Sequence, residues 1–377
     1  MILRLIDICH IEKGQQIDTD KLDDIKPYKY INGGIRESGY FDQYNTIGNT
    51  ITVSEGGASC GYVNYICEPF WCGCHCYRLT NSKVDSKYLY YALKANEQKI
   101  MALRTGVAMP NIRKSSFENM TVNIDDDAIR QEKVVLTLDN IVDLIKKSER
   151  ELDLLDSLTK SRFIELFGDV DSNTNGYPSY KIGSQFSLGA GGTPSTQNKE
   201  YWDNGTISWI GSNMCQNVVL YENDGKFITE KGYANSSAKL FKPDTVLIAL
   251  VGATIGKVAL LKFETTTNQN VLGMWDIKKN GYDPYYVYYY MQAIYGKFTA
   301  IGDGNFKMAS KAFVSDLDIL KPPLAEQTEF SMFVEKIDKL KFSVIEKQKR
   351  AHYSSASRIS WARFRYSSLS LVNCFTI

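Results

Sequence analysis

Five residues with metal-binding side chains lie within ten positions of one another, in the segment Cys67-Glu-Pro-Phe-Trp-Cys72-Gly-Cys74-His75-Cys76. Zinc prefers such thiolates and imidazoles, but its structural sites usually combine spaced pairs of ligands, and no second pair is in sight. Cys72, Cys74 and Cys76 alternate, and alternate residues of a strand share one face. Because free cysteine behaves as a small buried hydrophobic residue, we favour a buried strand over a zinc site and predict no bound metal.

Basic and amide side chains recur in two loop-like stretches without acidic residues, 98–117 and 304–315. Arginine, lysine and asparagine carry donors that match phosphates and base edges. One such loop alone would be an ordinary solvated loop, but its recurrence in both halves of the chain favours nucleic acid. The candidate DNA contacts are Arg36, Arg104, Asn111, Arg113 and Lys114 in the first half, and Ser212, Asn213, Lys257, Asn305, Lys307 and Lys311 in the second.

Residues suited to catalysis form no recognisable arrangement. His10, His75 and His352 are far apart in the sequence and fit no nuclease or hydrolase pattern. The glycine turns at 57–61 and 252–256 lack the spacing of phosphate-binding loops, so we interpret them as hairpins or close backbone crossings. The sequence therefore predicts no catalytic residues and no directly bound cofactor.

The elements that must position these loops are duplicated along the chain. The run from Thr50 to Val63 aligns with the run from Thr245 to Val258 at a constant offset of 195 residues. A tyrosine-rich stretch after Asp85 matches one after Asp283 at an offset of 198, and Phe117, Ile124 and Gln131 match Phe313, Leu320 and Gln327 at 196. Matches in the same order with a small drift indicate a tandem duplication.

Each copy has the same order of expected elements. Short β-branched and aromatic runs broken by glycine and asparagine predict strands and turns. A tyrosine-rich helix, a basic glycine-containing loop, a closing strand and a long charged helix follow. This order predicts an α+β protein with two similar mixed α/β globular domains.

The long helices are expected at about 127–167 and from Pro322-Pro323 onward, since proline is well suited to a helix start. Apolar residues at alternating steps of three and four are typical of a coiled-coil seam. Two unrelated surface helices are the alternative, but matching stripes in a duplication favour a seam. The expected stripes are Val134, Leu138, Ile141, Ile145, Leu152 and Leu155 on the first helix, and Phe330, Phe333, Ile337, Leu340 and Val344 on the second. All of these except Val134 and Phe330 are also the expected partner-helix residues.

These patterns divide the chain into a first domain at 1–125, a spacer helix at 126–168, a second domain at 169–323 and a distal helix at 324–350. The helical stripe stops after Arg350, and residues 351–377 contain no acidic residue. A frameshifted or replaced tail and a basic DNA-contacting tail are both open interpretations of this segment.

The composition excludes several classes of protein. The 44 Lys+Arg and 43 Asp+Glu residues give a formal charge of +1, which argues against binding nucleic acid everywhere by charge alone. No apolar run approaches the roughly 18 residues of a membrane span, and the first residues do not resemble a signal peptide. Eight cysteines are too few for a disulfide scaffold. We therefore expect a cytoplasmic protein with reduced cysteines and no membrane contact.

In this order, the motifs resemble the specificity subunit of type I restriction–modification systems over roughly residues 3–350. The first copy carries Gly33…Gly39-Tyr40, the run Asn49-Thr-Ile-Thr-Val-Ser-Glu-Gly-Gly-Ala58, Phe70-Trp71 and Gly106-Val-Ala-Met-Pro-Asn-Ile112. The second carries Leu188-Gly-Ala-Gly-Gly-Thr-Pro194, Ile207-Ser-Trp-Ile-Gly-Ser212 and Val251-Gly-Ala-Thr-Ile-Gly256.

The resemblance implies two target-recognition domains, each reading half of a bipartite sequence in double-stranded DNA, with an antiparallel coiled coil setting their separation. It also implies two modification subunits that dock on the helices and bring S-adenosylmethionine, and restriction subunits that bring ATP, Mg²⁺ and nuclease activity. The tail departs from the family pattern and puts the docking of one modification subunit in doubt. The alternatives are a non-catalytic coiled-coil adaptor for proteins, a specificity subunit inactivated by its altered tail, and a single-chain nuclease or methyltransferase.

Overall fold

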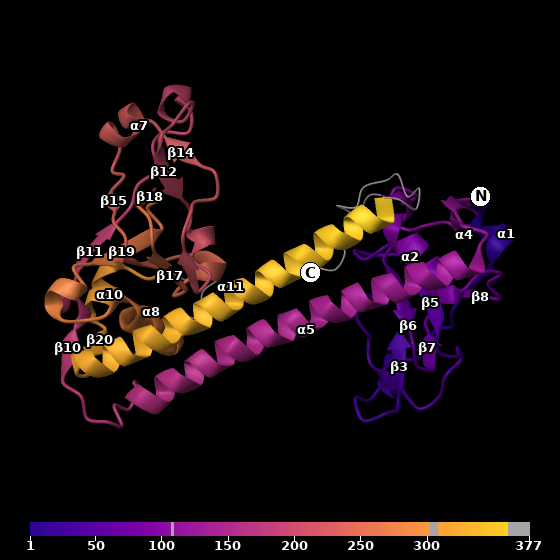
Figure 1. Cartoon of the computed structure of the whole chain (residues 1–377), viewed down its shortest axis with the longest axis horizontal. Coiled ribbons are helices and arrows are strands. Elements are labelled where there is room, and N and C mark those ends of the chain that lie inside the picture. The colour runs from indigo at the N-terminus through magenta and orange to yellow at the C-terminus, as the bar shows by residue number, and fades with distance from the viewer. Residues whose placement is uncertain (107–108, 302–307, 361–377) are drawn as a thin grey trace. The chain divides into compact units, whose positions relative to one another are not determined.

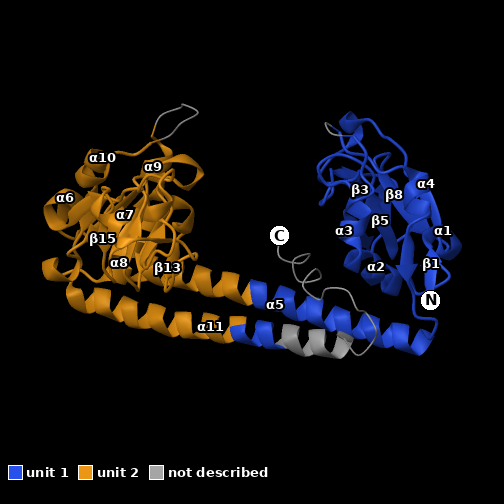
Figure 2. Ribbon diagram, turned by 90° about the horizontal axis from the view of Figure 1, so that it is seen from above, with its two compact units in different colours: residues 1–149, 346–377 blue, residues 150–345 orange. Residues whose placement is uncertain are grey.

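A computed structural model describes residues 1–106, 109–301 and 308–360 (Figure 1). The chain divides into two compact units, residues 1–149 with the segment from Glu346 onward, and residues 150–345 (Figure 2). Each unit holds one globular repeat and parts of two long helices. Among the described residues, no helix has the length and apolar character needed to cross a membrane.

The described residues of the first repeat form three small sheets and four short α-helices. A four-stranded antiparallel sheet has the order β2-β8-β5-β6, a second sheet has the order β4-β3-β7 with β3 and β7 parallel, and β1 pairs with β9. The elements are β1 Ile2–Arg4, α1 Leu5–Ile8, β2 His10–Lys13, β3 Tyr28–Ile31, β4 Tyr40–Phe41, β5 Thr50–Ser54, β6 Val63–Ile66, β7 Phe70–Cys72, β8 Cys76–Thr80, α2 Ser86–Ala95, α3 Glu97–Met101, α4 Lys114–Glu118 and β9 Thr121–Asn123.

The second repeat has the same topology with additional strands. Its sheets have the orders β11-β19-β16-β17-β13 and β14-β12-β18-β15, β12 and β18 are parallel, and β10 pairs with β20. The elements are β10 Ser179–Lys181, α6 Ile182–Gln185, β11 Ser187–Ala190, β12 Ile207–Ile210, β13 Val218–Leu220, β14 Phe227–Ile228, α7 Glu230–Ala234, β15 Leu240–Phe241, β16 Val246–Ala249, β17 Val258–Leu261, β18 Thr265–Thr267, β19 Val271–Trp275, α8 Pro284–Ala293, α9 Tyr295–Thr299, α10 Lys311–Asp316 and β20 Asp318–Leu320.

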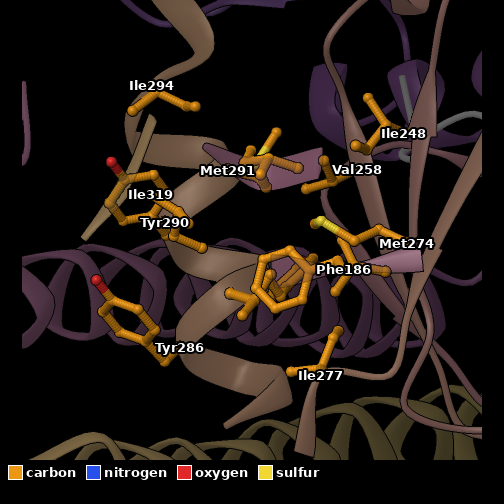
Figure 3. Close-up of a cluster of buried hydrophobic side chains, with 14 of the residues drawn as sticks. Phe186, Ile248, Val258, Met274, Ile277, Tyr286, Tyr290, Met291, Ile294 and Ile319 are labelled. Carbon is orange, nitrogen blue, oxygen red and sulfur yellow. The ribbon is translucent and has the colours of Figure 1, made fainter. Parts of the chain in front are cut away.

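The alternation of side chains along β16 explains the layers of the second repeat. Val246 and Ile248 belong to the core that contains Tyr286 and Tyr290 of α8. Figure 3 shows Ile248, the two tyrosines and Met291 in this core. Leu247 and Ala249 lie in a second core, with Ile210 of β12 and Phe241 of β15. Successive residues of a strand point to opposite faces. The five-stranded sheet is therefore covered by the tyrosine-rich helix α8 on one face and by the four-stranded sheet on the other.

The tyrosine-rich helices predicted from the sequence are confirmed as α2 and α8. Asp85 caps α2 by accepting a hydrogen bond from the amide of Tyr88 at 2.8 Å, and Asp283 caps α8 by accepting one from Tyr285 at 2.8 Å. Aspartate is a favoured N-cap because its carboxylate satisfies an amide that has no partner within the helix. Burial raises the pKa of Tyr88 and of Tyr286.

The first long helix, α5, runs over Ala128–Phe167, as the apolar spacing predicts. The second, α11, runs over Leu324–Ser360 and so continues beyond the predicted end at Arg350. The loss of the apolar stripe therefore does not end the helix, since no proline or glycine follows Arg350 within it. Residues 361–377 of the predicted tail lie outside the described residues.

Candidate nucleic-acid interface

The turn between β5 and β6 is the centre of the candidate site in the first repeat. Gly57 and Gly61 both have left-handed φ angles, 77° and 88°. A Cβ at Gly61 would lie 3.0 Å from Cγ of Met101 at the end of α3. Glycine is needed here for both conformation and close approach, which confirms the prediction of a hairpin and a close crossing.

Within the predicted basic stretch 98–117, the described residues 104–106 and 109–111 pack on this turn. The Nε atom of Arg104 donates to the carbonyl of Cys60 at 2.7 Å, and its Nη2 atom donates to the same oxygen. The amide of Gly57 donates to the carbonyl of Pro110 at 3.0 Å, and Asn111 forms an isolated bridge with Gly56. The contact to Cys60 gives Arg104 a structural role that the sequence did not reveal.

A third segment, the loop that contains Arg36, reaches the same turn. The hydroxyls of Ser54 and Ser59 both donate to the carbonyl of Gly33, the second at 2.5 Å. Arg36 is exposed in this loop. The structure thus brings the loop of Arg36 and the segment of Arg104 and Asn111 together at the turn between β5 and β6, which makes three segments in all. Arg113 and Lys114 follow directly at the start of α4, where both are exposed.

Ser59 also stands in the spacing Gly57-x-Ser59-x-Gly61, which matches that of a hydrolase nucleophile. In hydrolases this serine sits between a strand and a helix with a histidine as base. Here it lies between two antiparallel strands and its hydroxyl is held by the Gly33 carbonyl. The spacing therefore serves the turn.

A buried carboxylate next to the turn, that of Glu55, takes part in the hydrogen bonds that hold the chain before Arg113. Glu55 is 6% exposed and accepts from Nζ of Lys13 at 2.7 Å. The hydroxyl of Tyr77 donates to the carbonyl of Ile112 at 2.9 Å, and burial is the main cause that raises the pKa of Tyr77. The amide of Ile112 in turn donates to the carbonyl of Glu55 at 2.8 Å. These bonds anchor the chain immediately before Arg113.

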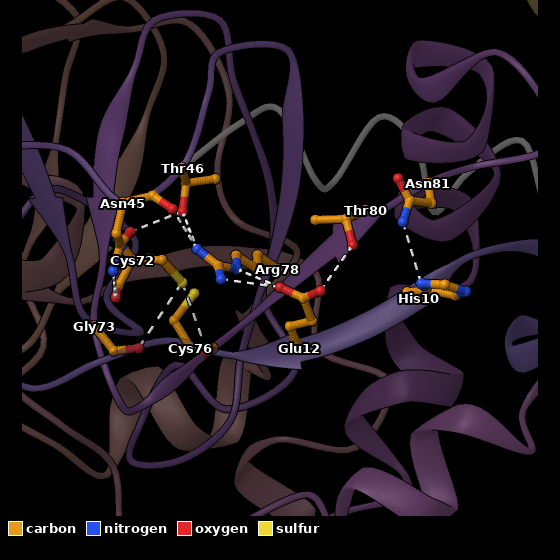
Figure 4. A network of polar contacts seen from close by, with 10 residues as sticks. All are labelled: His10, Glu12, Asn45, Thr46, Cys72, Gly73, Cys76, Arg78, Thr80 and Asn81. Carbon is orange, nitrogen blue, oxygen red and sulfur yellow. Dashed lines mark hydrogen bonds and ion pairs between the residues drawn. The ribbon is translucent and has the colours of Figure 1, made fainter.

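Arg78 is a further cation with a structural role (Figure 4). Its Nε donates to Glu12 at 3.0 Å, and its Nη1 donates to the hydroxyl of Thr46 at 2.9 Å and to the carbonyl of Asn45 at 2.5 Å. The side chain of Asn45 pairs with both backbone groups of Cys72. Arg78 in β8 and Cys72 in β7 belong to different sheets, so this network joins the four-stranded sheet to the sheet β4-β3-β7.

The cysteine-rich segment does not form the single strand that its alternation predicted. Cys72 ends β7, Cys74 lies in a turn, and Cys76 begins β8 in another sheet. Gly73 precedes the turn, and a larger residue there would not fit, because a Cβ atom added at this position would clash with the side chain of Asn32. The adjacent Cys76 thiol and burial raise the pKa of Cys72. In the described part of the chain, no group of three or more His, Cys, Asp or Glu residues is placed to hold a metal ion.

The second repeat assembles its surface from the corresponding three segments. Ser212 and Asn213 lie in a short 3-10 turn after β12, and Asn213 is exposed. Lys257, in the turn between β16 and β17, donates to the side chain of Gln216 at 2.7 Å, which joins these segments. Gly252 and Gly256 in this turn have left-handed φ angles, 69° and 75°, as in the first repeat.

The third segment of the second repeat precedes α10. The amide of Ala309 donates to the carbonyl of Leu250 at 2.8 Å, the counterpart of the bond between Ile112 and Glu55. Lys311 is exposed at the first position of α10. The predicted contacts Asn305 and Lys307 lie outside the described residues. We call the two matched groups of segments the three-segment surfaces.

On α5 the residues predicted for the seam are all at least partly buried, whereas on α11 one of them is exposed. Leu138, Ile141, Leu152 and Leu155 are partly buried and Ile145 is buried, as predicted. On α11, Ile337 and Val344 are buried and Phe333 is partly buried, but Leu340 is 53% exposed. The buried residues of α11 in this region include Phe330, Val334, Ile337 and Val344, so after Phe330 the buried face continues at Val334, four residues on, and Phe333 is only partly buried.

Within residues 150–345, the two helices run antiparallel. Arg162 of α5 pairs with Glu329 near the start of α11, whereas Asp156, earlier in α5, pairs with Lys341 further along α11. Large apolar side chains are exposed on both long helices: Ile129, Leu136, Leu144, Leu154, Leu158 and Ile164 on α5, and Met332, Leu340, Phe342 and Ile345 on α11.

Comparison with known proteins identifies relatives of this fold. A curated relative from Mycoplasma genitalium is 35% identical over 139 residues, 36% of this chain and 36% of that protein. The EcoR124I/EcoR124II type I restriction enzyme specificity subunit of Escherichia coli is 34% identical over 107 residues, 28% of this chain and 24% of that protein. These alignments thus span about a third or less of the curated relatives.

A solved structure extends the likeness to the whole fold. The type I restriction–modification S subunit from M. genitalium matches with a TM-score of 0.66 and 19% identity, over 95% of this chain and 94% of that chain. The family described as type I restriction modification DNA specificity domain matches residues 1–154 and again residues 175–352. Two matches that together cover most of the sequence show that the chain belongs to this family.

Proposed function

We propose that the chain is the DNA-recognition subunit of a type I restriction–modification complex, in which each repeat reads one half of a bipartite target. The observation that carries this proposal is the recurrence of the three-segment surface. In both repeats, two further segments meet at the turn between corresponding strands, and these segments or the helix starts beside them carry exposed cationic or amide side chains such as Arg36, Arg113, Asn213 and Lys311. A duplicated surface suits a target with two parts.

The chemistry of these residues suits the grooves of double-stranded DNA. Arginine and lysine donate to phosphates and to guanine, and asparagine pairs with adenine. Arg113 and Lys114 in the first repeat and Lys311 in the second begin corresponding helices. We assign base or phosphate contacts to these exposed residues, and a supporting role to Arg104 and Lys257, whose donors already hold the turns.

The long helices are proposed to set the distance between the repeats and to dock two modification subunits. Exposed apolar side chains such as Leu154 and Phe342 mark surfaces suited to protein partners. We place S-adenosylmethionine on the modification subunits, and ATP and Mg²⁺ on restriction subunits. The chain itself is then a non-catalytic, cytoplasmic subunit.

Binding of the chain with its modification subunits to DNA of random sequence tests this function. The account expects enrichment of a site with two defined parts and an undefined spacer. A chain that binds the subunits but no DNA would instead support the protein-adaptor alternative. At the offset of 196 residues between the repeats, position 351 corresponds to Leu155 of the first long helix. A complex that forms only when residues 351–377 are replaced by the part of the first helix from Leu155 onward would support inactivation by the tail.

A further inference from the structure

A buried glutamine lies near the start of each long helix, at matched positions of the two repeats. Gln327 of α11 is fully buried. Its Oε1 accepts a hydrogen bond from the amide of Asp283 at 2.9 Å, and its Nε2 donates to the carbonyl of Pro322 at 2.8 Å. Asp283 caps α8, and Pro322 lies in the connector before α11. One side chain therefore joins the helix, the domain and the connector between them.

Gln131 of α5 makes the same two contacts in the first repeat. Its Oε1 accepts from the amide of Asp85 at 3.4 Å, and its Nε2 donates to the carbonyl of Asp125 at 2.7 Å. Asp85 caps α2, and Asp125 lies in the connector before α5. Gln131 is 6% exposed. The conserved geometry within one chain indicates that both glutamines do the same work.

A tyrosine of the capped helix bonds to the chain in each repeat, to the connector in the first and to the strand residue just before the connector in the second. The hydroxyl of Tyr88 accepts from the amide of Asp125 at 3.0 Å, and the hydroxyl of Tyr286 donates to the carbonyl of Leu320 at 3.0 Å. The connectors are short, because β9 ends at Asn123 and α5 begins at Ala128, while β20 ends at Leu320 and α11 begins at Leu324. Bonds at both sides of so short a connector oppose rotation of the domain about it.

We propose that Gln131 and Gln327 are positioning residues that fix the orientation of each DNA-reading repeat on its own helix, and thereby the spacer length between the two half-sites. This inference rests on the proposed function. A glutamine amide has one acceptor and one donor group, so it can satisfy an N–H and a C=O at once. In a buried position, both partners lose their hydrogen bond if the amide is removed. The domain then samples other angles on its helix without any change in the residues that face DNA.

The two positions differ in strength. In the second repeat, Ser331 also donates to the carboxylate of Asp283, whereas Val135 stands at the corresponding place in the first. A pocket of about 750 Å³ borders Gln131, lined also by Val84, Ile124 and Val135. The longer bond to Asp85 and the adjoining pocket make the first junction looser. Changes at Gln327 are therefore expected to act more strongly than changes at Gln131.

The test uses the full chain in complex with its modification subunits. Methylation is measured on a series of DNAs in which the two half-sites are separated by spacers from two base pairs shorter to two longer than the natural one. Gln327→Leu keeps the side-chain volume and loses both hydrogen bonds. The preference for the natural spacer over its neighbours should fall about tenfold, the change expected from the free energy of a buried hydrogen bond.

Gln327→Glu keeps an acceptor for Asp283 but sets a carboxyl oxygen against the carbonyl of Pro322, so its preference for the natural spacer should also fall. Gln131→Leu should give a smaller loss than Gln327→Leu. Thr328→Ala, at the exposed next position of the same turn, is the matched control and should keep the natural preference. The bases preferred within each half-site should be unchanged in all variants.

A purely structural role would lower methylation equally at all spacers and leave the spacer preference unchanged, and this result would overturn the inference. If Gln327→Leu does not fold, Gln327→Glu and Gln131→Leu carry the same comparison. Failure of the unmodified complex to methylate any gapped site would overturn the proposed function instead, so the two failures are distinct.

Discussion

The ring of Phe163, near the end of α5, lies edge to face with the ring of Phe330, near the start of α11, with 5.4 Å between their centroids. Both side chains belong to the core of the second repeat, which also contains Tyr286. The end of the first helix and the beginning of the second are thus packed into the same domain. This contact therefore lies at one end of the antiparallel pair that the two helices form within residues 150–345.

Phe330→Ala should destabilise this part of the molecule by about 3–5 kcal/mol, because it removes a fully buried aromatic ring and leaves a cavity. Urea or thermal unfolding measures the loss. Phe342→Ala is the matched control, since Phe342 lies on the same helix and is 66% exposed. Equal effects of the two changes would contradict the assignment of the core face of α11.

Arg104→Ala should loosen the turn between β5 and β6, since both hydrogen bonds to the carbonyl of Cys60 are lost. We expect a loss of about 1–2 kcal/mol in stability and faster amide hydrogen exchange at Gly61. Lys13→Ala, which removes the neighbouring bond to Glu55, provides a comparison next to the same turn. Unchanged exchange at Gly61 in Arg104→Ala would show that the guanidinium does not hold the turn.

Arg113→Ala should relax the base preference of one half-site and leave the other unchanged, because Arg113 is exposed on the surface of the first repeat alone. A well-placed arginine contact to a base contributes roughly 1–3 kcal/mol of discrimination. Lys311→Ala should affect only the other half-site. Binding assays with DNAs altered in one half at a time separate the two effects, and an equal loss at both halves would sink the assignment.

Leu340→Ser should weaken the binding of a modification subunit and leave stability nearly unchanged, because the side chain is 53% exposed on α11. Titration of the purified chain with the modification subunit measures the affinity. Lys339→Ser tests whether any change at a neighbouring exposed position has this effect. A clear loss of stability in Leu340→Ser would instead indicate that Leu340 packs in the seam between the helices.

Asp338→Asn should stabilise the protein at neutral pH, and the gain should shrink as the pH falls. Burial is the main cause that raises the pKa of Asp338; Asp156 and Glu335 add to it, whereas Lys341 and Lys262 oppose it. A carboxyl whose folded pKa is raised favours the folded state when protonated, and that contribution is lost as pH rises through the folded pKa. Thermal unfolding of both proteins between about pH 4 and 7 tests the sign, and a gain that grows toward low pH would contradict it.

The duplication made the fold predictable to a large extent. The offsets between Thr50 and Thr245, and between Gln131 and Gln327, place corresponding elements in the same order, and the structure gives both repeats the same strand pairings. The glycine turns and the tyrosine-rich helices were predictable for the same reason. Each occurs in both repeats, the turns with glycines in left-handed conformations and the helices with an aspartate cap.

Two errors arose where local patterns had more than one solution. Apolar residues at both Phe330 and Phe333 permit two registers of the seam, and packing of Phe330 and Val334 in the domain core selects one. The alternating cysteines fit one strand, but the turn at Gly73 divides them between two sheets. Tertiary contacts decide both cases, and local periodicity does not contain them.

The candidate interface was predictable as a set of loops but not as a set of free side chains. Arg104 and Lys257 looked equivalent to Arg113 and Lys311 by residue type, yet each of the first two bonds to its own domain. The partners of Arg104 and Lys257 lie 44 and 41 residues away in the sequence. Such pairings depend on the folded backbone.

Mapping of methylated sites on random DNA after co-expression of the chain with its modification subunits tests the central claim most directly. The account predicts one motif with two defined halves separated by a spacer of fixed length, with Arg113→Ala altering one half and Lys311→Ala the other. A single contiguous motif, or a two-part motif in which both changes alter the same half, would contradict it.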